Sequence, residues 1–287
     1  MKLAIFADLH IYHPFAHSTS SRDVHYWYYQ GIESYIREVV DKEHPDTVIF
    51  LGDIHHANFK SSDRYNYFRR LVDILRLEYR ASVVVVVGNH DTSGSYTLEK
   101  ARVIQEVPYP HYATTPQLHR IGDYSVLLLP FLQRERIIPV LSKFQTTDKV
   151  FILSHNNIYL DSTFYDTPMV KYSDVLNLLP SATLINGHIH RFYAEPGYYQ
   201  LGSVNPTSYK EYLNAVGCCV VSEKGIKLYK NTHLFLLSCL SAEFLPELVD
   251  FLQKAEEYSS IVFLLSTPDV YDKVKQYSCI KAIQFVR

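Results

Sequence analysis

The chain has 287 residues, enough for one large domain with a full core or for one domain with a small appended unit. Hydrophobic residues make up 47% and charged residues 20%, a globular composition that excludes a disordered chain. The formal net charge of -2 excludes a global basic field. A polyanion would therefore have to bind through a local patch or through bound cations.

The four cysteines form no CxxC pair, which argues against a disulfide framework or a thiolate zinc site and suits a reducing compartment. Cys218 and Cys219 are adjacent in a strand-like run and should point to opposite faces of a sheet. The apolar run over 3–7 is too short for a signal peptide, and no stretch approaches the roughly 20 apolar residues of a membrane span. We therefore expect a cytoplasmic protein without membrane association.

Three strand-like segments separated by helical ones open the chain. Strands are expected over 2–7, 47–51 and 83–87, with helices between Asp23 and His44 and over 61–80. This βαβαβ order favours a parallel sheet with right-handed crossovers. Such a sheet brings the carboxyl ends of the three strands to one edge.

The second half has shorter strand-like segments, which indicate a second sheet packed against the first. They are expected over 118–130, 149–153, 182–185 and 198–201, and as a hairpin over 216–229. Residues 233–287 form another βαβαβ pattern, without metal-ligand residue types at its strand ends. We expect one domain over 1–232 and a small α+β domain over 233–287.

Polar side chains follow nearly every buried strand. Taken singly, a histidine near a strand end is more often a surface or hydrogen-bonded residue, and an aspartate after glycine is usually part of a turn. Together they are oxygen and imidazole donors without Cys, Lys or Arg, which suits manganese, iron or zinc. The set is larger than one ion can use, so it favours two, with Asp53 on a central strand as the bridging ligand. The candidate ligands are Asp8, His10, Asp53, Asn89, His155, His188 and His190.

The order of these motifs resembles the calcineurin-like metallophosphoesterases. The motifs are Asp8-Leu9-His10, Gly52-Asp53, Gly88-Asn89-His90-Asp91, His155 and Gly187-His188-Ile189-His190. The resemblance covers the first expected domain and implies an α/β fold, a four-layer α/β/β/α sandwich, that hydrolyses phosphoesters. It implies two divalent ions, Mn2+ first, with Mg2+, Fe2+ and Zn2+ as alternatives. One ion would be held by Asp8, His10, Asp53 and His190, and the other by Asp53, Asn89, His155 and His188.

Within that superfamily the chain is similar to the SbcD-type DNA repair nucleases. His56 lies three residues after Asp53, the segment 201–208 matches their Gly-Ser…Thr-Ser run, and the unit over 233–287 is similar to their capping domain. This resemblance implies DNA as substrate, an SbcC-type SMC-like ATPase as partner and a homodimer. The chain departs from larger members because no clear helical pair that would dock the ATPase follows the capping unit.

The remaining site residues have distinct expected roles. His90 is expected to donate a proton to the leaving oxygen or to stabilise the transition state, and His56 to position the phosphate. His55 is expected to be structural, and Asp91 to hydrogen-bond its own loop or to cap a helix instead of binding metal. Candidate DNA contacts are Arg64, Tyr159 and Tyr165, for which a solvated helix face and core packing are the alternatives.

The function expected from these residues is a two-metal DNA nuclease. It would act as an exonuclease on duplex ends, as a single-strand endonuclease, or as both, in recombination, repair or replication. One alternative is a phosphodiesterase of the same fold that acts on nucleotides or other small molecules. Another is a non-catalytic scaffold, against which the complete ligand set argues, because a degenerate site should have lost a ligand or His90.

Overall fold

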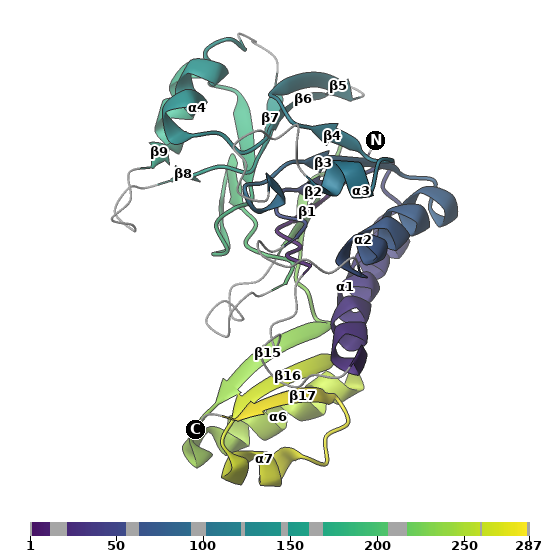
Figure 1. Cartoon of the computed structure of the whole chain (residues 1–287). Helices are drawn as coiled ribbons and strands as arrows, with labels where there is room; N and C mark the ends of the chain where they lie inside the picture. Colours follow the sequence, from purple (N-terminus) through teal and green to yellow (C-terminus); the bar gives the residue numbers. More distant parts are fainter. Residues whose placement is uncertain are drawn as a thin grey trace.

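The computed structural model of the chain describes most of the sequence, and the structure reported below refers to that part. Two six-stranded sheets and a separate three-stranded sheet account for most of its strands (Figure 1). The described residues are 2–11, 22–55, 63–92, 102–121, 124–144, 149–160, 169–205, 217–258 and 260–285.

The first sheet has the strand order β14-β13-β1-β2-β3-β4. Its strands β1 to β4 pair in parallel, which confirms the arrangement expected from the βαβαβ pattern. β1 is buried along its whole length, and so are nearly all positions of β2. The six strands are β1 (Leu3–Ala7), β2 (Thr47–Leu51), β3 (Ser82–Val86), β4 (His111–Ala113), β13 (Cys218–Ser222) and β14 (Gly225–Tyr229).

The hairpin β13–β14 belongs to the first sheet, which corrects the expectation that it builds the second one. β13 pairs antiparallel with β1, from Leu3 opposite Val221 to Phe6 opposite Cys218. Without β13 the fully buried β1 would be an edge strand with unpaired backbone groups. Cys218 packs in the outer core and Cys219 between the sheets, so the predicted alternation of the two cysteines is confirmed.

The second sheet has the order β11-β12-β10-β7-β6-β5, with β6, β7, β10 and β12 parallel to one another. A two-stranded ribbon, β8 with β9, follows β7 in the sequence. The strands are β5 (Gln117–Ile121), β6 (Tyr124–Leu129), β7 (Val150–Ser154), β8 (Ile158–Tyr159), β9 (Val170–Lys171), β10 (Ala182–Asn186), β11 (Tyr193–Glu195) and β12 (Tyr198–Gln200).

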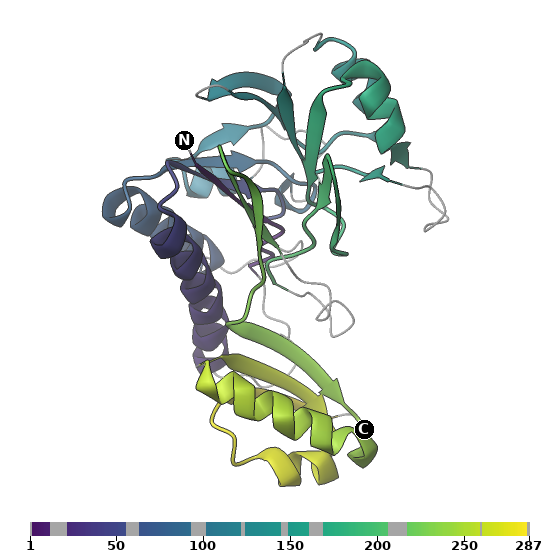
Figure 2. The same ribbon diagram turned by 180° about the vertical axis from the view of Figure 1, so that it is seen from behind.

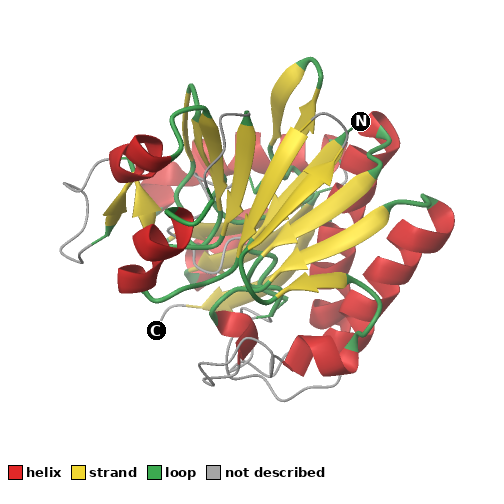
Figure 3. Ribbon diagram, turned by 90° about the horizontal axis from the view of Figure 1, so that it is seen from above, coloured by secondary structure: helices red, strands yellow, loops and turns green. Residues whose placement is uncertain are grey.

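Three apolar cores separate four layers, as predicted for the sandwich. One core joins the helices α1 and α2 to the first sheet, a second lies between the sheets, and a third joins the second sheet to α4 and α5. Seen from above, helices flank the strands on both sides (Figure 3). The helices are α1 (Arg22–Glu43), α2 (Asp63–Asp73) with its π-helical continuation η1 (Ile74–Glu78), the 3-10 turn η2 (His90–Thr92), α3 (Arg102–Glu106), α4 (Arg134–Leu141) and α5 (Tyr172–Leu178).

The chain ends in a three-stranded parallel sheet with its own core, which we call the C-terminal unit. It lies at the N-terminal end of α1, away from the other sheets (Figures 1 and 2). No helix in the described part of the chain is both long and apolar enough to cross a bilayer. The unit contains β15 (Leu234–Cys239), η6 (Ala242–Phe244), α6 (Leu245–Glu257), β16 (Ile261–Ser266), α7 (Pro268–Val274) and β17 (Ile280–Phe285). The domain boundary at residue 233 stays a prediction.

Candidate metal centre

The carboxyl ends of parallel strands from both sheets meet at one edge, and the candidate ligands lie there. The ring of His155, after β7, reaches across to the first sheet, where its Nδ1 lies 2.8 Å from the backbone oxygen of Leu51. The backbone N–H of His188, after β10, donates to Asp8 Oδ2 at 2.9 Å. Asp8 and His188, 180 positions apart in the chain, are therefore in direct contact.

The first cluster is built from Asp8, His10 and His190, with Asp53 at its edge. The Nε2 atoms of His10 and His190 face each other at 2.8 Å. Asp8 Oδ1 lies 3.4 Å from the His190 nitrogen and 3.7 Å from the His10 nitrogen. Two imidazole nitrogens and a buried carboxylate aimed at one point are a donor set that fits a divalent cation.

The second cluster is built from Asp53, His155 and His188. His155 Nε2 lies 3.2 Å from Asp53 Oδ1 and 3.3 Å from Asn89 Oδ1. The other oxygen of Asp53, Oδ2, lies 3.8 Å from His10 Nε2 in the first cluster. Asp53 thus presents one carboxylate oxygen to each cluster, and this donor set also fits a divalent cation.

The buried charges in the two clusters depend on one another. Burial alone would raise the pKa values of Asp8 and Asp53, but the surrounding histidines outweigh it and hold both below their ordinary range. Burial favours a neutral His155, yet the two aspartates raise its pKa to about 9. Burial and the charge of His155 lower the pKa of His188 to about 4. Both carboxylates are therefore ionised and His188 is neutral at pH 7.

The backbone around the clusters is constrained. Among the described residues, six non-glycine positions have a positive φ, and four of them are candidate ligands: Asp8, His10, Asp53 and His188. Such conformations are costly and persist where the surrounding structure enforces them. A Cβ at Gly52, whose φ is +76°, would overlap the His155 ring, and one at Gly88 would overlap Asp53. These close approaches explain why glycine precedes Asp53 and Asn89.

The carboxylate of Asp91 connects the loop that follows Asp53 to its own loop. Its carboxylate accepts hydrogen bonds from the backbone N–H groups of Ile54, His55 and Gly88, at 2.9, 3.4 and 2.9 Å. Burial and the charge of Asp53 raise the pKa of Asp91 to about 7. The expectation that Asp91 hydrogen-bonds its own loop is confirmed. His55 is buried with its ring 4.6 Å from that of Tyr65, as expected of a structural residue.

Gln200 is a supporting residue that the sequence analysis missed. Its Nε2 lies within 2.9–3.1 Å of the backbone oxygens of Asn186, Gly187 and Ile189. It thereby fixes the turn that carries His188 and His190. The only sequence signal was a polar residue within a short strand-like segment. Asn157 was also missed, although its Oδ1 lies 3.1 Å from His188 Nε2.

His90 is partly exposed, unlike the buried His10 and His155. Its side chain is 30% exposed, and its Nε2 lies 3.9 Å from Asp53 Oδ2. Its backbone N–H donates to Asp53 Oδ1 at 2.9 Å, which fixes the residue at the edge of the centre. Burial lowers the pKa of His90 against the raising effect of Asp53.

The predicted substrate contacts are only partly described. His56 and Tyr165 lie outside the described residues, as do residues 206–208 of the Gly-Ser…Thr-Ser run, and at Arg64 only the backbone of α2 is described. Tyr159 is buried, with 9% of its surface exposed. Its ring has little free surface for a base to stack on, so the structure favours the alternative of core packing.

Comparison with known protein families assigns the chain to the same family that its motifs resemble. The family model for calcineurin-like phosphoesterases matches residues 1–233. The chain belongs to this family. Members of the calcineurin-like phosphoesterase family are metal-dependent phosphoester hydrolases, and the fold and the two clusters described above agree with that chemistry.

Individual relatives of this phosphoesterase are distant. The SbcD component of the nuclease SbcCD from Staphylococcus saprophyticus is 28% identical over 71 residues, which is 23% of this chain and 19% of that protein. A candidate 5'-nucleotidase from Staphylococcus aureus is 16% identical, with 80% of this chain and 54% of that one covered and a TM-score of 0.48. The phosphoesterase Yfce from E. coli is 13% identical, with 79% and 92% covered and a TM-score of 0.35. The chain thus matches about a fifth of the curated relative's length.

Proposed function

We propose that the chain is a two-metal DNA nuclease that uses Mn2+ as its preferred ion. The observation that carries this proposal is the convergence of the complete ligand set, in which Asp53 presents one oxygen to each cluster. Paired metal sites of this kind serve displacement reactions at phosphorus. A degenerate, non-catalytic site would be expected to lack at least one of these side chains.

Each cluster would hold one metal ion. Asp8, His10, Asp53 and His190 would hold one ion, and Asp53, Asn89, His155 and His188 the other. Divalent ions there would neutralise phosphoryl oxygens and activate a water for attack on phosphorus. The ionised carboxylates and the neutral His188 are ready to bind, whereas His155 must release a proton first.

His90 is proposed as the proton donor to the leaving oxygen. Its position at the edge of the centre and its partial exposure support contact with a substrate. His90 does not need to bind metal, because each cluster already has enough donors. His56 would position the scissile phosphate.

DNA as substrate is supported by two observations. The relative from Staphylococcus saprophyticus is named as part of a nuclease. The C-terminal unit follows the phosphoesterase domain and packs on its helix α1, as a capping domain would. An SbcC-type ATPase partner and a homodimer belong to the same proposal.

The test is to incubate the protein with Mn2+ and a labelled linear duplex, in parallel with a chromogenic small diester. We expect cleavage of the duplex, and a loss of about 10²–10⁴-fold in His90→Ala while Mn2+ remains bound. His119→Ala, on strand β5, is the matched control and should cleave normally. Hydrolysis of the small diester alone would contradict a DNA nuclease. Inertness on both substrates, together with absence of Mn2+ binding, would favour a scaffold.

A further inference from the structure

The loop that carries Asp8 and His10 is held by side chains from distant parts of the chain. Three consecutive backbone oxygens of this loop each accept a side-chain hydrogen bond. Ser203 Oγ donates to the oxygen of Asp8 at 2.8 Å, and Asn205 Nδ2 to that of Leu9 at 2.6 Å. The hydroxyl of Tyr28 donates to the oxygen of His10 at 3.3 Å.

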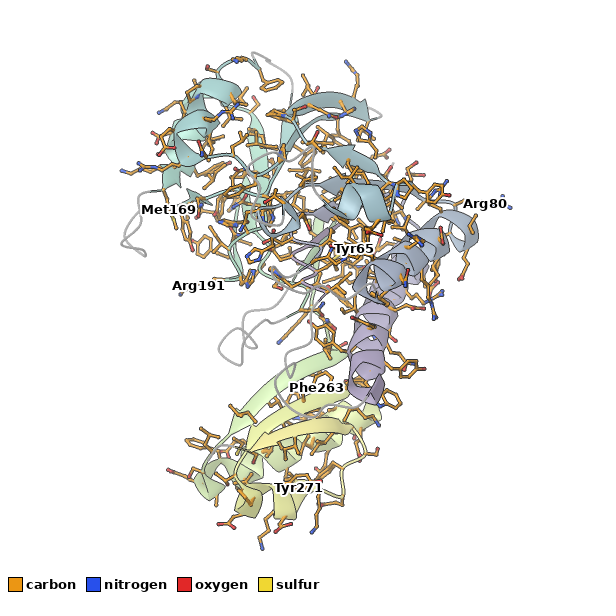
Figure 4. All side chains as sticks on the ribbon, in the orientation of Figure 1. Tyr65, Arg80, Met169, Arg191, Phe263 and Tyr271 are labelled. Carbon is orange, nitrogen blue, oxygen red and sulfur yellow. The ribbon has the colours of Figure 1, made fainter. Side chains whose placement is uncertain are left out.

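Tyr28 connects this loop to the C-terminal unit. It lies on α1, and its side chain is 1% exposed. Its ring lies 6.1 Å from the ring of Phe263, which is buried in β16, the central strand of the unit. Phe263 is labelled in Figure 4 on the C-terminal sheet beside α1. The hydroxyl of Tyr28 therefore contacts the backbone of the candidate ligand His10, and its ring contacts the C-terminal sheet.

A second connection runs through Asn231, just before β15. Its Nδ2 donates to the backbone oxygen of Val204 at 3.0 Å, and its Oδ1 accepts from the N–H of His233 at 2.9 Å. Val204 lies between the two residues that hold Asp8 and Leu9. The Asp8–His10 loop is thus connected to the core of the C-terminal unit through Tyr28, and to the start of that unit through the segment around Val204.

The packing around these contacts is tight. Leu234, Ile261 and Phe263 of the C-terminal unit belong to the same apolar core as Tyr28 and Leu9. A Cβ at Gly31, one turn after Tyr28, would lie 3.1 Å from Leu234 Cβ, so α1 and β15 are in close contact. A close-packed interface of this kind transmits displacements instead of absorbing them.

We propose that Tyr28 is a positioning residue through which the C-terminal unit sets the geometry of the Asp8–His10 loop. The affinity of the first cluster for its cation then depends on the position of the C-terminal unit. Displacement of this unit would weaken metal binding at the first cluster more than at the second, which the loop reaches only through the contact of Asp8 with the backbone of His188 and through Asp53. This inference rests on the metal roles proposed above for Asp8 and His10.

The test is a Mn2+ titration followed by electron paramagnetic resonance, on the full chain without substrate. Tyr28→Phe removes only the hydroxyl. It should weaken the binding of one of the two Mn2+ ions about tenfold, the lower end of the affinity loss that follows when a ligand's supporting hydrogen bond is removed. In a His190→Ala background, where the first cluster is already broken, the same substitution should weaken binding of the remaining ion much less than tenfold. Tyr35→Phe is the matched control, because Tyr35 is also buried on α1 and donates to a backbone oxygen, that of Tyr229, at 2.7 Å.

The link to the C-terminal unit is tested by Phe263→Leu. It should weaken binding of the same ion about threefold, within the range of a lost aromatic pair. This effect should disappear in the Tyr28→Phe background. Unchanged Mn2+ binding in Tyr28→Phe, or equal weakening of both ions, would overturn the inference. Failure of the unsubstituted protein to bind Mn2+ would instead overturn the proposed metal roles, and this inference with them.

Discussion

At the scale of single residues, Gly88 is a position with very little room. A side chain there would overlap the carboxylate and the backbone nitrogen of Asp53, and approach His155 Nε2 to 2.9 Å. Because Asp53 contributes to both clusters, Gly88→Ala should weaken binding of both Mn2+ ions by at least about tenfold. Isothermal titration calorimetry measures this directly. Gly225→Ala, at the β13–β14 turn, meets no atom within 4 Å; its φ of +112° strains the turn, but the variant should retain normal Mn2+ affinity. Equal affinity in both variants would contradict this prediction.

The convergence of the candidate ligand residues could largely be predicted from the sequence, but the side chains that support them could not. Asp8, Asp53 and His155 closely follow buried strands, so strand patterns alone predict that they share an edge. Gln200 and Tyr28 contact the turns of ligands 10 to 18 residues away through side chains, and nothing in their local sequence indicates those partners. Such contacts depend on the tertiary approach of segments, which periodicity does not encode.

At the scale of elements, Glu43 ties the end of α1 to the first sheet. Its carboxylate accepts from Lys227 Nζ at 2.7 Å, from the hydroxyl of Tyr229, and from Lys2 Nζ at 3.1 Å. The bonds from Lys227 and Tyr229 are the main reason that the pKa of Glu43 falls from 4.5 to about 2.

A lowered pKa in the folded state stabilises the fold above the unfolded pKa, and this contribution is lost as the pH falls through the folded pKa. The ionised Glu43 should therefore stabilise the protein above about pH 4.5 and cease to do so near pH 2. Urea unfolding of the natural protein and of Glu43→Gln should show a stability difference that is largest above about pH 5 and shrinks across this window. A difference that is independent of pH would contradict the role assigned to Glu43.

The elements themselves were predicted better than their sheet membership. The alternation of Cys218 and Cys219 was correct, because side-chain period along a strand is a local property. The placement of β13 and β14 in the second sheet was wrong. The hairpin pairs with the edge of β1, which comes from the opposite end of the phosphoesterase domain's sequence, so its local pattern does not indicate which sheet it joins.

At the scale of the whole molecule, the C-terminal unit shares a core with α1 and the first sheet in addition to its own. Differential scanning calorimetry should therefore show one cooperative transition, which Mn2+ shifts upward. At an ion concentration about 100 times the dissociation constant, one bound ion adds about 2.7 kcal/mol to the free energy of unfolding. Two transitions, of which only one responds to chelation by EDTA, would show that the C-terminal unit unfolds separately.

The central claim is that one edge of the two sheets holds two cations with Asp53 between them. Anomalous diffraction from crystals grown with Mn2+ tests it most directly. We predict two peaks, one among Asp8, His10 and His190 and one among Asn89, His155 and His188, each in contact with one oxygen of Asp53. A single ion, or ions bound away from Asp53, would contradict the claim.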